Sequence, residues 1–389
     1  MASTLSTKEA EPPTGGVLGA FAHPDDETIT AGGLLASAAR VGLPTTVVVG
    51  TRGERGQVIP LDLVHLDGDP AGLAHQRARE LARACSALGV RSHYFLDEVP
   101  GLAARRPARF TDSGMVWVRP GVAGPVPEAG PDALSAVPVE VPARLLAARL
   151  RVERPQVVIT EDPRGGYGHP DHVHMHQIAM RAVELANEAG EVDDADDPLA
   201  GLEPWRVPVV VWVVAREDRY RESLRWLADK LTHAPQFGTR GDVLATLPPT
   251  TELPTFVFPP EKVDVVVDFA AVLPAVVSAL RAHRSQLQDV QHEEVARRDQ
   301  PARGWFAVAN GLLLPLLGST GLYLVPGFDR VGDLYVAPVH HSVTEKIPVL
   351  ERYSLAGTFG LARLDVRDRL GDTRGTDRLA AFLGVKIVP

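Results

Sequence analysis

Short apolar runs alternate with longer segments of helical periodicity through the first half of the chain. The apolar runs predict strands at residues 17–22, 45–49, 92–96, 156–160 and 209–214. Between successive runs, apolar residues recur every three or four positions, which predicts helices at residues 28–40, 70–88, 143–151 and 171–186. Strands that are apolar along their whole length are typical of a sheet buried on both faces. We therefore expect an α/β fold with a doubly wound, mainly parallel, Rossmann-like sheet and helices on both faces.

The pattern is less regular in the second half of the chain. It predicts one more strand at residues 262–267 and a helix at residues 270–288. The stretch 102–137 is rich in Pro, Gly and Arg and is predicted to be a surface insertion. The expected organisation is a disordered tail, one catalytic domain and a C-terminal extension or lid of unknown role, at residues 1–15, 16–328 and 329–389.

Composition narrows the class of protein. Of the 389 residues, 45% are hydrophobic and 23% are charged, which is typical of a globular chain able to bury a core. A net charge of -9 repels polyphosphate, so we expect no nucleic-acid partner. The single cysteine, Cys85, excludes an intrachain disulfide, and the most apolar run, residues 312–317, is too short to span a membrane and contains a proline. No secretory signal is recognisable at the start, so we expect a cytoplasmic protein; the sequence does not indicate its oligomeric state.

The first candidate for chemistry is the segment Ala-His-Pro-Asp-Asp-Glu at residues 22–27. It follows the first predicted strand and precedes a predicted helix, which is where doubly wound folds bind ligands. A nucleotide-binding fold would have a glycine-rich turn here, whereas three carboxylates would repel a phosphate and suit a cation. His23 and Asp26 offer one imidazole and one carboxylate, ligand types that zinc accepts.

The second candidate is the segment Gly-Gly-Tyr-Gly-His-Pro-Asp-His at residues 165–172, which also lies between a strand and a helix. If the two strands are neighbours, the two loops meet, and His172 completes a site of two histidines and one carboxylate with a coordination position left for water. A water bound to zinc has a pKa of about 7, and Asp25 could accept its remaining proton as general base. The pattern thus predicts one Zn²⁺ per chain, bound by His23, Asp26 and His172.

Each motif also has an ordinary structural interpretation. Aspartate at the start of a helix is commonly an N-cap, and histidine beside proline is commonly part of a turn. Either motif alone is ambiguous between the two interpretations. Their occurrence together, at the ends of two predicted parallel strands, favours the catalytic one.

At these motifs the sequence resembles the PIG-L/LmbE-like zinc-dependent N-deacetylases. The resemblance extends over about residues 16–317 and is greatest for the mycothiol-pathway branch, which contains N-acetylglucosaminyl-inositol deacetylases and mycothiol conjugate amidases. It implies His23, Asp26 and His172 as zinc ligands and Asp25 as general base. It further implies that His169 stabilises the oxyanion or protonates the leaving amine, that Tyr167 polarises the carbonyl, and that Asp171 orients a histidine. Finally, it implies contacts from Arg77 and Asp112 to sugar or inositol hydroxyls, although Arg77 could instead form a surface ion pair with Glu80.

The resulting hypothesis is hydrolysis of an N-acetyl amide on a small amino-sugar or glycosyl-inositol substrate, releasing acetate and a free amine. Two related enzymes remain open: an amidase of mycothiol conjugates and a deacetylase of an antibiotic amino sugar. A remote alternative is a non-catalytic sugar-binding protein, which would be expected to have lost part of the base and ligand set. A dinucleotide-dependent oxidoreductase is disfavoured because its glycine-rich first turn is absent.

Overall fold

The computed structural model describes residues 15–98, 109–119, 121–189, 197–293, 302–308, 310–329 and 373–387. Its centre is a mixed sheet whose strands follow the order β15-β10-β14-β7-β6-β1-β2-β3, with β9 paired to β7. Helices cover both faces of this sheet, so the predicted fold class is confirmed.

The parallel half of the sheet contains the five strands that the apolar runs predict. These are β1 (Val17–Phe21), β2 (Thr45–Val49), β3 (Ser92–Phe95), β6 (Val157–Thr160) and β7 (Val209–Arg216). The chain first moves outward from β1 through β2 to β3, and then returns to place β6 on the other side of β1. The boundary between β1 and β6 is therefore the point where the strand order reverses, which is the usual ligand-binding position in such sheets.

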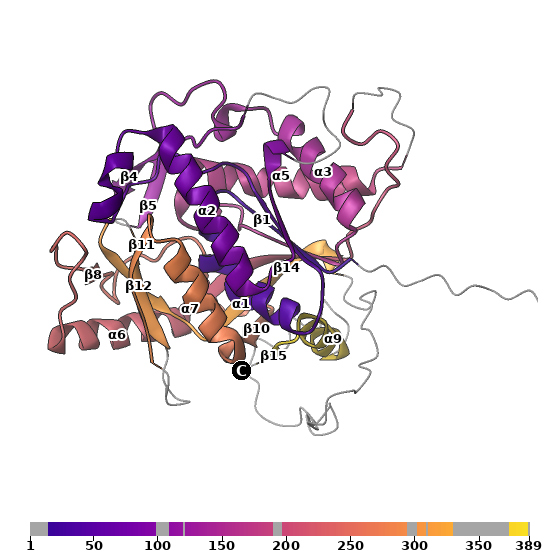
Figure 1. The fold of residues 1–389 in the computed structure, drawn as a ribbon. Coiled ribbons are helices and arrows are strands. Elements are labelled where there is room, and N and C mark those ends of the chain that lie inside the picture. The colour runs from indigo at the N-terminus through magenta and orange to yellow at the C-terminus, as the bar shows by residue number, and fades with distance from the viewer. Residues whose placement is uncertain are drawn as a thin grey trace, which may run out of the picture.

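Two helical layers enclose these strands. One contains α1 (Asp26–Arg40), α2 (Pro70–Leu88) and α7 (Leu273–Ala282), and the other contains α3 (Glu140–Glu153) and α5 (Pro170–Asn187), which lie side by side (Figure 1).

Alternate residues of a strand point to opposite faces of the sheet and pack in different hydrophobic cores. Val47 and Val49 pack in the core of the first layer, whereas Val48 between them packs in the core of the second. Both faces of these strands are thus apolar, which explains their uninterrupted hydrophobic sequences.

Beyond β7 the sheet continues with antiparallel strands. β14 (Ser319–Asp329) pairs with β7, β10 (Val265–Asp268) pairs with β14, and β15 (Lys386–Ile387) pairs with β10. The helix α9 (Thr373–Leu383) precedes β15 and packs against α1. The described part of the predicted C-terminal extension therefore forms one edge of the main sheet.

A second sheet lies beside the first, in the order β11-β12-β13-β8. Its strands are β11 (Leu287–His292), β12 (Gly304–Val308), β13 (Leu312–Leu316) and β8 (Ala245–Thr246), and α6 (Glu217–His233) packs on it. The remaining elements are short: β4 (Met115–Arg119), β5 (Val122–Pro125), β9 (Val257–Phe258), α4 (Gly165–Gly168) and the 3-10 turns η1 (Leu61–Leu66), η2 (Leu96–Glu98), η3 (Leu134–Ala136), η4 (Pro260–Lys262) and η5 (Ala270–Val272).

Two predictions from the sequence are wrong. The helix expected at residues 270–288 ends at Ala282, because the His283 carbonyl accepts the N–H groups of Gln286 and Leu287 in a turn before β11 begins. The surface insertion expected at 102–137 is, in the part that the structure describes, a contributor to the interior: Phe110, Asp112 and Ser113 are buried.

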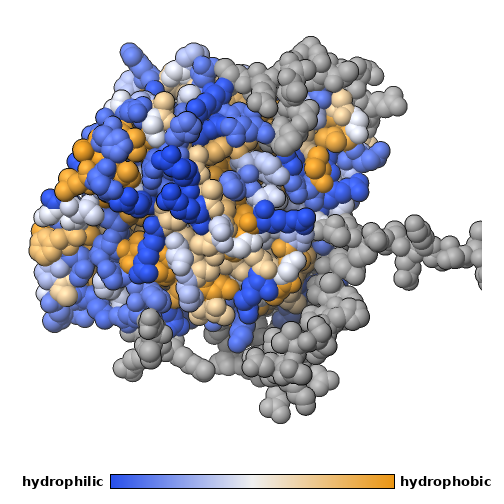
Figure 2. Space-filling model, viewed as in Figure 1, coloured by the Kyte–Doolittle hydropathy of each residue, from blue (hydrophilic) through white to orange (hydrophobic). Residues whose placement is uncertain are grey.

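The predicted division into tail, domain and extension stays a prediction, because residues 1–14 and 330–372 lie outside the described residues. Among the helices that the structure describes, none combines the length and the apolarity needed to cross a membrane. On the face shown in Figure 2, hydrophobic residues form separate groups among hydrophilic ones.

Candidate metal and active site

The segment after β1 turns sharply into α1. The Asp26 carboxylate accepts the backbone N–H of His23 at 2.8 Å, which closes the turn, and the Asp25 carbonyl accepts the N–H groups of Thr28 and Ile29. Asp25 has a backbone φ of 114°, a conformation that residues other than glycine rarely adopt. Such strain persists only where the surroundings enforce it, and it is concentrated at functional sites.

Three donor atoms from the two predicted motifs meet beside this turn. His23 Nδ1 and His172 Nε2 are 3.2 Å apart. Asp26 Oδ2 lies 3.6 Å from His23 Nδ1 and 3.4 Å from His172 Nε2. Zinc bonds nitrogen and oxygen ligands at about 2.0–2.1 Å, so two ligands of a tetrahedral ion lie about 3.4 Å apart. The spacing of the three atoms, all on buried residues, therefore fits one such ion.

A second layer of carboxylates holds the two imidazoles. Asp171 Oδ2 lies 3.1 Å from His23 Nε2, and Glu161 Oε2 lies 3.2 Å from His172 Nδ1. Ser113 in turn donates to Asp171 through both its hydroxyl and its backbone N–H. Partners of this kind fix the tautomer and orientation of metal-binding histidines. The sequence analysis gave no role to Glu161 or Ser113, although Glu161 directly follows a predicted strand and Ser113 adjoins Asp112.

These carboxylates control the charge of the two histidines. Burial lowers the pKa of His172, but Asp26 and Glu161 outweigh it and raise that pKa to about 9. Burial also opposes the charged form of His23, yet Asp112, Asp171 and Asp26 raise its pKa well above the usual value. Without a cation, protons neutralise this acidic cluster, and a divalent ion can replace them.

His169 is bound differently from the two ligand histidines. Its Nδ1 accepts the backbone N–H of Asp171 at 3.1 Å, so in the neutral ring the proton is on Nε2. Burial, and then the charges of His23 and His172, lower the pKa of His169 well below its usual value. By distance His169 could join His23 and His172 in a group of ligands, but a neutral ring with this tautomer offers a hydrogen-bond donor instead.

Tyr167 lies on the wall beside these rings. Its ring centroid is 5.0 Å from that of His172 and 5.8 Å from that of Trp117, a residue of β4. Burial and the nearby carboxylates, Asp26 first among them, raise the pKa of the Tyr167 phenol well above its usual value, so the hydroxyl stays protonated.

Arg77 is buried beneath the turn. The alternative expected from the sequence, a surface ion pair with Glu80, is therefore wrong. Its guanidinium donates to the carbonyl oxygens of Pro24 and Gly53 and lies 3.3 Å from Asp25 Oδ1. Burial raises the pKa of Asp25 and Arg77 opposes this effect; the resulting pKa is about 6. Asp25 is therefore ionised at neutral pH while remaining a usable base.

Asp112 lies beside the Nε2 atom of His23. Its Oδ1 is 3.7 Å from His23 Nε2 and accepts the N–H of Gly114, while Oδ2 accepts the N–H of Arg55. All the residues predicted for the site line or adjoin one cavity of about 640 Å³, whose lining includes His23, Asp25, Asp26, Arg77, Asp112, Tyr167, His169 and His172. Asp171 is placed behind His23. The structure thus brings together every residue that the two motifs and the resemblance indicated.

Comparison with known proteins gives the family. The chain is 42% identical to 1D-myo-inositol 2-acetamido-2-deoxy-alpha-D-glucopyranoside deacetylase from Kineococcus radiotolerans over 271 residues, which make up 70% of this chain and 68% of that protein. The PIG-L family, described as GlcNAc-PI de-N-acetylase, matches residues 18–183. The chain belongs to the PIG-L family.

A second relative agrees with this assignment. The deacetylase of the same name from Thermobispora bispora is 36% identical over 78% of this chain and 85% of its own length. The predicted family and the predicted class of enzyme, an N-deacetylase, are confirmed. Among solved structures, N,N'-diacetylchitobiose deacetylase from Pyrococcus horikoshii aligns with a TM-score of 0.43 and 21% identity, covering 71% of this chain and 72% of that one.

Proposed function

We propose that this PIG-L family member is a cytoplasmic, zinc-dependent deacetylase that removes the acetyl group from a 2-acetamido-2-deoxyglucosyl inositol, releasing acetate and a free amine. The observation that carries the proposal is the triangle formed by His23 Nδ1, His172 Nε2 and Asp26 Oδ2, with sides of 3.2–3.6 Å. The relatives named as inositol glycoside deacetylases support the substrate class. One zinc ion per chain fits this single set of donors.

The ion would be held by His23, Asp26 and His172. When bound, zinc polarises the amide carbonyl and acidifies a water molecule. Asp25 accepts the proton of the attacking water, because its carboxylate lines the cavity, is ionised at neutral pH and makes no ligand contact. Asp171 orients His23 through its side chain and His169 through its backbone N–H.

His169 and Tyr167 act on the other side of the scissile amide. The Nε2–H of His169 and the Tyr167 hydroxyl donate hydrogen bonds to the oxygen that gains negative charge as the tetrahedral intermediate forms. The leaving amine then needs a proton, and Asp25 can return the one that it accepted from the water, because a neutral His169 could give a proton only by becoming an imidazolate. Both side chains line the cavity together with the ligands, which supports these roles.

The sugar and inositol hydroxyls are proposed to contact Arg77 and Asp112. Both residues line the cavity. The Arg77 guanidinium uses one N–H each on the carbonyl oxygens of Gly53 and Pro24 and has further N–H groups that can donate to a hydroxyl group. Asp112 Oδ1 already accepts one backbone N–H and has a second lone pair.

The test is release of acetate from a panel containing N-acetylglucosaminyl-inositol, a thiol conjugate with the same glycoside, and an N-acylated antibiotic amino sugar. We expect the first to be hydrolysed with the highest kcat/KM, by zinc-loaded protein and not by chelator-treated protein. Faster cleavage of the thiol conjugate or of the antibiotic sugar would assign the chain to that alternative reaction. Full activity after complete removal of metal would refute the mechanism.

A further inference from the structure

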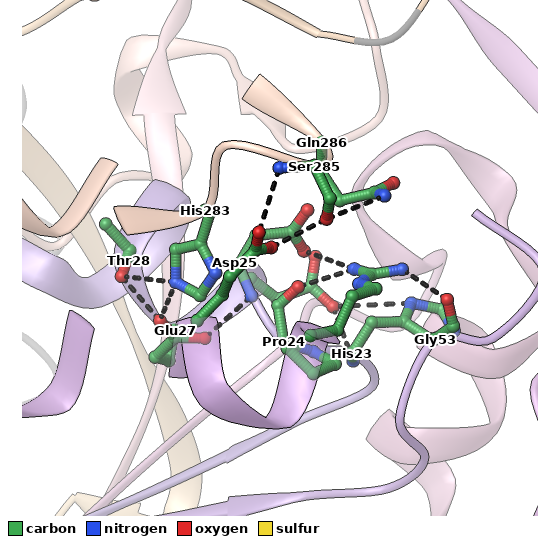
Figure 3. Close-up of polar contacts among 12 residues, drawn as sticks. His23, Pro24, Asp25, Glu27, Thr28, Gly53, His283, Ser285 and Gln286 are labelled. Atoms are coloured by element: carbon green, nitrogen blue, oxygen red, sulfur yellow. Dashed lines mark hydrogen bonds and ion pairs between the residues drawn. The ribbon is translucent and has the colours of Figure 1, made fainter. Parts of the chain in front are cut away.

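A buried ion pair lies directly beneath the active-site turn and is not part of the metal site. His283 Nε2 is 2.8 Å from Glu27 Oε1, and both side chains are inaccessible to solvent, with residue exposures of 1% and 0%. His283 follows the last residue of α7, 256 positions away from Glu27. Figure 3 shows Glu27 between the imidazole of His283 and the backbone of Asp25.

The second oxygen of Glu27 leads to the general base. Glu27 Oε2 accepts the backbone N–H of Asp25 at 2.9 Å. Asp25 is the residue with a φ of 114°, which is unfavourable for any residue that has a Cβ atom. Its carbonyl is already held by the first turn of α1, so the bond from Glu27 fixes the peptide on the other side of the strained residue.

A purely structural role accounts poorly for this pair. Buried ion pairs contribute little to stability compared with apolar side chains of the same size, because both charges lose their hydration. The Thr28 hydroxyl donates to Glu27 Oε1 and lies 3.3 Å from His283 Nε2. Beyond it the core on this face of the sheet is apolar, and Phe269, Val276 and Leu280 belong to the same core as α1. The pair is better explained by the backbone of Asp25 that it holds in place than by its contribution to the stability of the fold.

We propose that Glu27 and His283 are positioning residues, which keep the backbone of Asp25 in its strained conformation and thereby aim the Asp25 carboxylate into the cavity. His283 orients Glu27, and Glu27 holds the Asp25 N–H. The inference rests on the proposed role of Asp25 as general base. A base displaced by about 1 Å can lose about 100-fold in rate while substrate binding is unchanged.

The first experiment compares three substitutions of His283, to Phe, Asn and Gln, for kcat, KM and zinc content. The conclusion holds even if H283F fails to fold, because His283→Asn and His283→Gln form a matched pair: asparagine is too short to reach Glu27, whereas glutamine can donate to it. We expect H283F and H283N to lower kcat by about 10- to 100-fold with KM and bound zinc unchanged, and H283Q to recover most of the loss.

The control is Ser285→Ala. Ser285 is in the same segment, is equally buried and donates to a buried carboxylate, Glu80, but it has no bond to Glu27 or Asp25. We expect S285A to keep the kcat of the wild type. An equal loss of kcat in S285A and H283N would overturn the proposal, because the cause would then be general damage to this segment.

A double substitution separates positioning from other effects. If His283 acts only through Asp25, H283N should have no further effect on kcat in a D25N background, whereas additive losses would overturn the proposal. Crystal structures of H283N and H283Q provide a readout that needs no turnover: we expect residue 25 to leave the left-handed region in the first and keep it in the second. An unchanged φ in H283N would also overturn it. If the wild type hydrolyses no substrate in the panel, the proposed function fails, and this comparison still decides whether the pair positions Asp25.

Discussion

Asp25 and Asp26 are adjacent carboxylates with different surroundings, and this difference gives the first prediction. Asp26 Oδ2 lies between two imidazoles, whereas Asp25 Oδ1 faces the Arg77 guanidinium. Asp26→Ala should lose zinc and activity together. Asp25→Asn should retain zinc and lower kcat by about 10²- to 10⁴-fold, because asparagine keeps the shape and loses the basicity. Elemental analysis and turnover of both variants check this; loss of metal in D25N with retention in D26A would mean that the two roles are reversed.

The charge of the ligand histidines gives a second prediction, which concerns pH. Zinc requires neutral rings, but the carboxylates raise the pKa of His172 to about 9 and that of His23 well above its usual value. Below these pKa values the rings hold protons in the metal-free protein, so zinc must displace them. Apparent zinc affinity should therefore fall as pH falls, by about tenfold per pH unit for each protonated ring. Calorimetric titration at pH 7 in buffers of different ionisation enthalpy should detect release of about one to two protons, and release of none would contradict the assignment of ligands.

At this scale the sequence was informative where chemistry is local. His23, Asp25 and Asp26 share one turn, and His169, Asp171 and His172 share another, so the two motifs together indicated a site, and the family resemblance implied the roles of His169 and Asp171. Glu161 and His283 could not be found in this way. Glu161 and its partner His172 lie 11 positions apart, at the two ends of the connection from β6 to α5. His283 and Glu27 lie 256 positions apart, and the packing of α7 against α1 brings them close.

At the scale of elements, the glycines before α5 allow the turn that carries Tyr167 and His169. Gly168 has φ 91°, and a Cβ atom there would lie 2.8 Å from the Ala123 carbonyl oxygen of β5. Gly168→Ala should therefore displace Tyr167 and His169 relative to the ligands and lower kcat by about tenfold or more, with zinc content retained. Gly201→Ala is the matched control, because Gly201 has φ 69° with open space around it and shares only the backbone strain. Kinetics and metal analysis of both variants test this; equal kcat in the two would show that the contact with β5 does not position the turn.

The same scale shows why some elements were predicted and others were not. The parallel strands are buried on both faces, so their sequences are continuously apolar and easily recognised. β14 and β12 mix buried with half-buried residues along their length, so their sequences are less continuously apolar than those of the parallel strands. The helix predicted at 270–288 failed for a related reason: the apolar spacing from Val276 to Leu287 passes through a turn that bonds to distant residues, including Glu80.

At the scale of the whole molecule, the C-terminal residues give the last prediction. An independent extension could be removed without effect, but Leu379, Phe382 and Leu383 of α9 are buried in the core that contains α1, and β15 completes the sheet beside β10. Phe382→Ala should therefore lower the free energy of unfolding by about 3–5 kcal/mol, the usual loss for a buried aromatic residue. Lys386→Ala, an exposed change in β15, should alter it by less than about 0.5 kcal/mol. Denaturant unfolding of both variants measures the difference. Phe382 belongs to the core around α1 and is not among the residues that line the cavity, so F382A should still bind one zinc ion while it is folded. If F382A unfolds no more easily than K386A, α9 does not belong to the core.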